Sequence, residues 1–134
     1  MNPSAVASTV RLHLLATAGV SALVGTRIYR LVLPQSPRLP AITIQRISRV
    51  TNDTMNGDTG PDDFRIQVDS WAADPAAAEQ LAAAVEAALR NWGSGDILRA
   101  RFDGDRDFFE AGASPAELYR VSADYIVTAA VAAA

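Results

Sequence analysis

The stretch from Phe64 to Ala72 constrains the fold most, because it alternates apolar and polar side chains and passes directly into a helix signal. Such alternation is typical of a β-strand with one buried face and one polar face. Asp74 and Pro75 follow, an N-cap acceptor and a proline at the first helical position. A half-buried strand that leads into a helix predicts an α+β domain, in which helices cover the apolar face of a sheet.

The helix that begins at Pro75 is expected to run to about Trp92, where Gly93 and Gly95 end it. Its apolar side chains recur at the spacing of one helical face, namely Ala78, Leu81, Ala82, Val85, Ala88, Leu89 and Trp92. A second helix is predicted from Ser4 to Thr17, with Gly19 interrupting it. The stripe on that helix consists of Val6, Val10 and Leu14, and one more short turn is expected over residues 20–24.

The remaining apolar segments are expected to complete the sheet. Four of them are predicted to be strands: Arg27 to Leu33, Ala41 to Val50, Ile97 to Asp103 and Leu118 to Thr128. The second strand shifts its apolar phase, which indicates a bulge near Gln45 and Arg46. The third is expected to turn Leu98, Ala100 and Phe102 inward. The chain, 1–134, is therefore expected to form one domain, a mostly antiparallel sheet of four to five strands with two helices packed on one face.

Three segments lie outside these elements. Residues 51–63 form a long, polar and acidic stretch, which is expected to be a flexible loop. Residues 103–115 are rich in turn-forming side chains. The alanine-rich tail, residues 129–134, offers only small side chains, so we expect it to fray or to pack on a neighbour.

Composition narrows the function. The net charge is −3 and the pI about 5.0, whereas a freestanding nucleic-acid-binding domain usually carries a basic excess. All 12 cationic residues are arginine. This bias is explained by the codon usage of a GC-rich genome, and arginine is also well suited to ion pairs at interfaces. There is no cysteine, so the chain has no disulfide or thiolate chemistry, and no apolar stretch approaches the length of a membrane span.

No catalytic, cofactor or metal site is predicted. His13 is the only histidine and has no acid that marks it as a catalytic base, so a packed or partly exposed side chain is expected. The acidic run Asp103 to Asp107, with Glu110, has its glycine and glutamate at the wrong positions for an EF-hand, so a solvated turn is expected. The glycines form no phosphate-binding loop.

The polar side of the predicted sheet is the candidate contact surface. Outward-facing strand residues, Trp71 at the strand end and two loop carboxylates are predicted to meet a second subunit or a partner: Arg65, Asp69, Trp71, Arg99, Arg101, Arg120, Asp58 and Asp62. Tryptophan and arginine are enriched where protein surfaces bind each other. Trp71 has a second interpretation, in which it folds over the start of the following helix.

Six stretches, taken in order, resemble a known family. They are Leu23–Tyr29, the connector from Leu33-Pro34-Gln35 to Leu39-Pro40, Ile42–Ser48, Arg65–Trp71 with its alanine-rich helix, Asp105-Arg106-Asp107 with Glu110, and Tyr119–Tyr125. Their order and spacing, over about Val6 to Thr128, resemble the tail terminator (tail completion) proteins of long-tailed bacteriophages. Head–tail neck proteins share general features of this pattern.

The resemblance implies a structural and non-enzymatic role. Such proteins form a ring, typically a hexamer, on the head-proximal end of the tail tube, end its polymerisation and offer a docking surface to the head–tail connector. DNA passes through the lumen without specific binding, no membrane is involved, and assembly takes place in the host cytoplasm. Two alternatives remain open: a head-completion or neck adaptor protein, and a small-molecule-binding α+β domain. The sequence does not separate a phage from a gene transfer agent or a domesticated tail.

Overall fold

The computed structural model describes residues 1–52, 60–111 and 117–131. Its helices are the 3-10 turn η1 (Pro3–Ala5), α1 (Val6–Ala16), α2 (Ala18–Val24) and α3 (Pro75–Leu89). Its strands are β1 (Ile28–Arg30), β2 (Ala41–Val50), β3 (Asp62–Ala72), β4 (Ile97–Ala111) and β5 (Glu117–Ala129). The bounds of β2 are those predicted, and β3 and β5 each extend slightly beyond their predictions.

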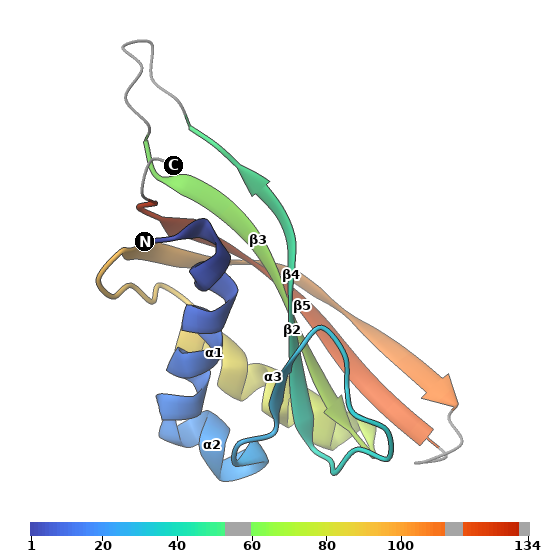
Figure 1. Cartoon of the computed structure of the whole chain (residues 1–134). Coiled ribbons are helices and arrows are strands. Elements are labelled where there is room, and N and C mark those ends of the chain that lie inside the picture. Colours follow the sequence, from blue (N-terminus) through green and yellow to red (C-terminus); the bar gives the residue numbers. More distant parts are fainter. Residues whose placement is uncertain (53–59, 112–116, 132–134) are drawn as a thin grey trace.

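The strands form one five-stranded sheet in the order β1-β2-β3-β5-β4. β1 pairs with β2 in parallel, and the other neighbours are antiparallel. The predicted α+β class and mostly antiparallel sheet are therefore confirmed, with one parallel pair that makes the sheet mixed. Figure 1 shows the helices together on one face of the sheet, and the β2–β3 and β4–β5 hairpins extending at opposite ends of it.

The first helical segment breaks at Thr17 rather than at the predicted Gly19. Thr17 is extended, with ψ of 114°, and its hydroxyl donates to the carbonyl oxygen of His13 at 2.7 Å. Gly19 lies inside α2. No single helix in the described part of the chain is long and apolar enough to span a membrane; the segments before and after Thr17 meet that test only as a pair, across a bend of 85°.

α3 begins as predicted, because a carboxylate oxygen of Asp74 accepts a hydrogen bond from the Ala77 amide at 2.8 Å. It ends at Leu89, however, and not at Trp92. The Trp92 ring instead stacks on His13, with 4.1 Å between the centroids. The Asn91 amide, which would donate within a longer helix, donates instead to the Ala100 carbonyl of β4 at 2.9 Å.

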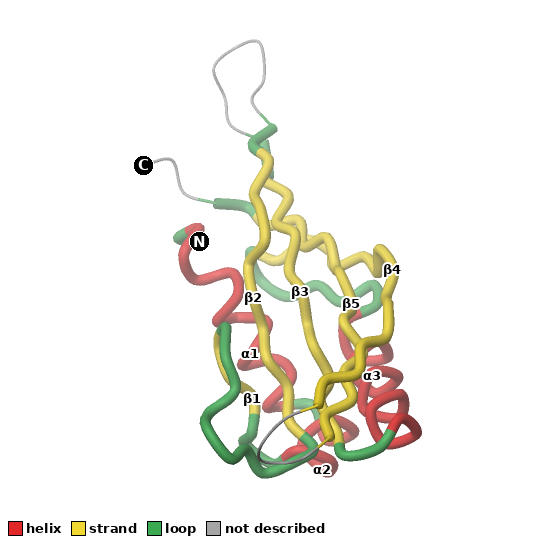
Figure 2. The backbone as a smooth tube through the Cα atoms, turned by 90° about the vertical axis from the view of Figure 1, so that its right-hand side faces the viewer, coloured by secondary structure: helices red, strands yellow, loops and turns green. Residues whose placement is uncertain are grey.

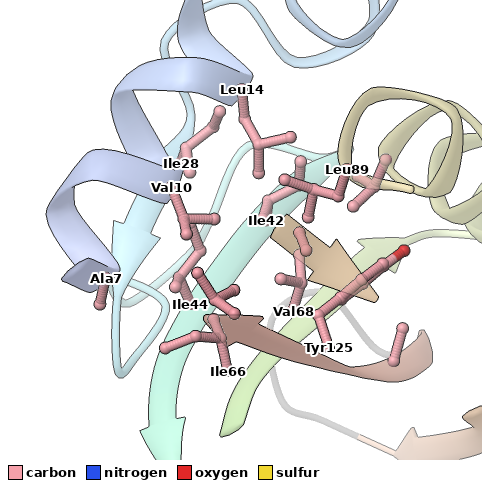
Figure 3. Close-up of a cluster of buried hydrophobic side chains, with 14 of the residues drawn as sticks. Ala7, Val10, Leu14, Ile28, Ile42, Ile44, Ile66, Val68, Leu89 and Tyr125 are labelled. Carbon is pink, nitrogen blue, oxygen red and sulfur yellow. The ribbon is translucent and has the colours of Figure 1, made fainter. Parts of the chain in front are cut away.

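The core lies between the helices and the sheet. Figure 3 shows Leu14 of α1 and Leu89 of α3 above side chains from the strands, among them Ile42 and Tyr125. Tyr125 is the largest of the fully buried side chains, and its ring meets the edge of Phe102 at 5.6 Å. Burial of each large apolar side chain contributes roughly 2 kcal/mol.

β4 differs most from the prediction. It continues to Ala111, so the expected turn-rich segment is a strand as far as that residue, and residues 112–116 lie outside the described part. The register shifts between Ile97 and Arg99, which leaves Leu98 53% exposed rather than inward. In β2 the predicted bulge is confirmed, as a register shift between Arg46 and Ser48.

The loop and tail predictions fall partly outside the description. Residues 53–59 and 132–134 are not described. Asp62 and Asp63 belong to β3 rather than to the loop. Ala129 is a fully buried residue of β5, and the Met1 ammonium group donates to the Ala130 carbonyl at 3.2 Å, so the chain is anchored at this point rather than frayed.

Candidate functional site

The side of the sheet away from the helices carries the candidate site. Residues that are direct partners on neighbouring strands share a face, so the register identifies this side. We call it the polar face, and its main side chains are Thr43, Arg65, Gln67, Asp69, Trp71, Arg99, Arg101, Arg106, Phe108, Glu110, Arg120, Ser122 and Asp124. Asp103, at the register shift in β4, joins them.

Arg120 of β5 organises one half of the polar face. Its guanidinium pairs with Asp69 at 3.0 Å and with Glu110 at 3.1 Å. It also lies between two rings, 5.0 Å from the centroid of Trp71 and 4.3 Å from that of Phe108. We call these five residues the Arg120 cluster. Only 20% of the Arg120 side chain and 8% of the Asp69 side chain are exposed, so the pair is largely desolvated.

Further hydrogen bonds connect the Arg120 cluster to β2. The Trp71 indole N–H donates to the Thr43 hydroxyl at 2.9 Å. The Gln67 amide donates to Asp69 at 3.0 Å. Trp71 therefore lies on the polar face against Thr43 and Arg120, and not over the start of α3. Through these contacts one set of side chains spans four strands.

Arg65 of β3 organises the other half. Its guanidinium donates to Asp103 at 2.8 Å and to Asp124 at 3.1 Å. Arg101 is 3.3 Å from Asp103, and Arg106 is 3.9 Å from Asp124. We call these five residues the Arg65 cluster. The hydrogen bond from Arg65 lowers the pKa of Asp103.

A register shift in β4 turns the Asp103 side chain toward Arg65 on the polar face. The shift lies between Phe102 and Gly104, and Gly104 has a φ of +124°, a conformation that a side chain rarely permits. Asp103 is the extra residue of β4 at this point. The sequence predicts Asp103 as the last residue of a strand, where a turn-rich segment begins, and so does not indicate its pairing with Arg65.

The structure brings five of the eight predicted contact residues into the two clusters: Arg65, Arg101, Asp69, Trp71 and Arg120. Arg99 lies on the polar face, opposite Thr128 and outside both clusters. Asp62 is buried and accepts a hydrogen bond from Arg49 at 2.7 Å, away from this face. Asp58 lies outside the described residues.

Phe108 and Glu110 are two members of the Arg120 cluster that sequence analysis did not find. They lie two and four residues after Arg106 in β4, so the two-residue period of a strand places all three side chains on one face. This spacing is the only feature of the sequence that indicates their position. Both faces of β4 are exposed here, so no apolar pattern marks the strand.

The polar face consists largely of ion pairs between side chains. Within the described ranges, no three His, Cys, Asp or Glu side chains come together as metal ligands would. The expected acidic turn over residues 103–107 is a strand, and its carboxylates diverge: Asp103 points to the polar face, whereas Asp105 and Asp107 belong to the helix side. His13 is packed, with Nε2 at 2.9 Å from the Ala88 carbonyl oxygen.

Comparison with known proteins identifies the family. A search of curated proteins found no match. A solved structure described as "Virion of native gene transfer agent (GTA) particle" has a similar fold, with a TM-score of 0.67, 21% identity, and coverage of 92% of this chain and 93% of that one. The model of the family described as "Tail completion protein gp17" matches residues 8–129. The chain belongs to this tail completion family, whose members are structural proteins of phage tails.

Proposed function

We propose that this protein caps the tail tube as a ring, ends tail polymerisation and provides the surface to which the head joins. The observation that carries the proposal is the family match over residues 8–129. The fold likeness to a chain in the virion of a gene transfer agent supports a place in a phage-like particle. The ring is a hexamer at the head-proximal end of the tail, assembled in the host cytoplasm. Its partners are the tube protein and the head–tail connector.

The polar face contributes the contacts of this ring with a neighbouring subunit or with the tube. Its interior, Asp69 with Trp71 and Arg120, fixes the shape of the surface because those groups already bind one another. Its outer cations, Arg99 and Arg101, are exposed and meet the partner. Arginine at such a rim sets orientation and specificity more than raw affinity.

This role requires no catalysis, and DNA passes through the ring without specific binding. Phosphate affinity comes from cationic contacts, and the arginines of both clusters are neutralised by carboxylates of the same face. The net charge of −3 adds to this effect. DNA is therefore expected to pass through the ring without being retained.

The test is to add the purified protein to growing tail tubes and to measure tube length by electron microscopy. Tubes should stop growing and carry a ring at one end. The double variant Arg99→Glu with Arg101→Glu should fold normally but weaken this capping, while Arg38→Glu, at an exposed arginine in the connector before β2, should cap like the wild type. Unchanged tube lengths would refute the proposal. Binding to heads without binding to tubes would indicate a neck adaptor instead.

A further inference from the structure

Charge is divided unevenly along the chain. The first 52 residues contain no aspartate or glutamate, and their arginines are Arg11, Arg27, Arg30, Arg38, Arg46 and Arg49. All 15 carboxylate side chains lie in the rest of the chain, beside the other arginines. The two parts thus carry charges of +6 and −9, which together give the net −3.

In the fold, the cationic part and the acidic part of the chain form opposite edges of the sheet. β1 and β2, with α1 and α2, come from the cationic part; β3, β5 and β4, with α3, come from the acidic part. Since β1 and β4 are the outer strands of the sheet, the outermost elements of the cationic and acidic parts lie on opposite sides of the described structure. Figure 2 shows α1 and β1 on one side and α3 and β4 on the other.

The cationic edge presents two exposed arginines. Arg30 of β1 and Arg46 of β2 line a shallow hollow with Ser4, Ala7 and Leu31. In residues 1–52, 60–111 and 117–131, neither is ion-paired; Arg30 donates only to the Ser8 hydroxyl, at 3.0 Å. Leu31 is exposed beside them, so the hollow offers apolar contact as well as charge. We call this surface the arginine edge.

The opposite edge presents a groove between α3 and β4. Its walls carry Glu79 and Glu86 from α3, and Asp105 and Asp107 from β4. Ala82 and Val121 lie between them. In the described part of the chain, only Glu86 of the four carboxylates is ion-paired, with Arg90 at 3.4 Å. We call this surface the acidic groove.

A buried hydroxyl next to the acidic groove also lacks a partner. Tyr125 is fully buried, and its hydroxyl makes no hydrogen bond among the described residues. Burial, with smaller contributions from Glu86 and Asp105, raises the pKa of this hydroxyl, so the group lies within electrostatic reach of two groove carboxylates. The hydroxyl itself is closed off from the groove, because Tyr125 is fully buried and does not line it.

The carboxylates of the acidic groove suit guanidinium groups better than a metal ion. No three of them are close enough to ligate one cation, as found for the described residues as a whole. A guanidinium presents a fork of donors that several spaced carboxylates bind well, and it is the only type of cationic side chain in this protein. The cationic group of matching chemistry is present on the protein's own opposite edge.

We propose that copies of this chain associate head to tail, with Arg30 and Arg46 of one copy docked in the acidic groove of the next. The contact is heterologous, as a closed ring requires, and the inference rests on the proposed function for that ring. Both surfaces lie on the helix side of the sheet, at opposite edges. Repeating the contact therefore keeps the helix layers of all copies on one side.

Charge reversal tests this contact. The variant R30E/R46E reverses the arginine edge, and E79R/D107R replaces two of the four carboxylates of the acidic groove by arginine, which cancels its net negative charge. Each variant alone removes the charge complementarity of the contact, so self-association should weaken about 100-fold. An equimolar mixture restores both kinds of contact in alternation, which an even-numbered ring permits, and should recover wild-type assembly. The single change Arg38→Glu, at an exposed arginine outside both surfaces, is the control.

Assembly is read by light scattering across concentration at low salt and by imaging of rings on tube ends, with urea unfolding to confirm that each variant is folded. The inference is overturned if either reversed variant assembles like the wild type, if the mixture does not recover, or if the wild type associates in neither assay. If the charge variants still form rings on tube ends, the inferred contact is wrong but the proposed capping function stands. If the mixture of variants assembles again but the tubes continue to grow, the proposed function is wrong and the inferred contact stands.

Discussion

The guanidinium carbon of Arg120 lies 5.0 Å from the centroid of the Trp71 indole, a residue opposite it on the neighbouring strand. The same guanidinium neutralises Asp69, whose carboxylate is almost completely buried. A charge so little exposed depends on its partner, because water no longer solvates it. Arg120 therefore holds the polar face together, and any contact that it makes with another protein is additional.

Replacing Arg120 by alanine should lower the free energy of unfolding by about 3 kcal/mol, since it leaves the Asp69 carboxylate buried and unpaired. Urea unfolding followed by circular dichroism measures this change. The matched control is Arg99→Ala on the same face, which should change stability by less than about 0.5 kcal/mol because Arg99 is exposed and lies outside the clusters. Equal effects of the two variants would contradict the assignment.

Asp74→Ala should destabilise the protein by about 1 kcal/mol, because it removes the acceptor that caps the Ala77 amide at the start of α3. Asp74→Asn retains an oxygen at the same position and should restore most of this stability. Both values come from denaturant midpoints. If the asparagine variant were as unstable as the alanine variant, the loss would come from charge and not from capping.

Tyr125→Phe should stabilise the isolated protein by about 1 kcal/mol, because it removes a buried hydroxyl that has no hydrogen-bond partner among the described residues. The ring and its packing on Phe102 are kept. Tyr119→Phe, a half-buried tyrosine on the same strand, serves as the control and should have little effect. A clear loss of stability in Tyr125→Phe would show that the hydroxyl is bonded.

Acid should weaken the Arg65 cluster. The pKa of Asp103 is lowered from its ordinary value of 3.8, chiefly by the hydrogen bond from Arg65. A carboxylate with a lowered folded-state pKa stabilises the protein above its unfolded pKa and loses this contribution as the pH falls through the folded value. The stability advantage of the wild type over Asp103→Asn should thus be constant from pH 7 to about pH 5 and shrink below about pH 4. An advantage that persists at pH 2 would contradict the assignment.

Where side chains alternate between buried and exposed, the sequence predicts the structure well. β3 and β5 were predicted closely, because each has a face against the core that imposes the two-residue period. The bounds of β2 were also predicted, although its first four residues are buried and its last six are exposed. The distal part of β4 was missed, because residues 105–111 are exposed on both sides and hydrophobicity carries no information there. The end of α3 was missed because Trp92 stacks on His13, a contact between distant parts of the chain.

The sequence predicts which residues of a strand share a face, but not which residues of different strands meet. Strand periodicity places Asp69 and Trp71 on one face of β3, and it places Arg120 on the outward face of β5. That Phe108 and Glu110 complete the cluster depends on the register between β4 and β5, which two bulges in β4 shift. Asp62 was misplaced because its strand begins two residues before the predicted start, and there the carboxylate is buried with Arg49.

The capping role can be tested by imaging tail tubes assembled with and without the purified protein and measuring their lengths. Capping should give tubes of limited length, each closed at one end by a ring with sixfold symmetry, and uncontrolled lengths when the protein is left out. Tubes that grow equally long in its presence, with no density at their ends, would contradict the capping role.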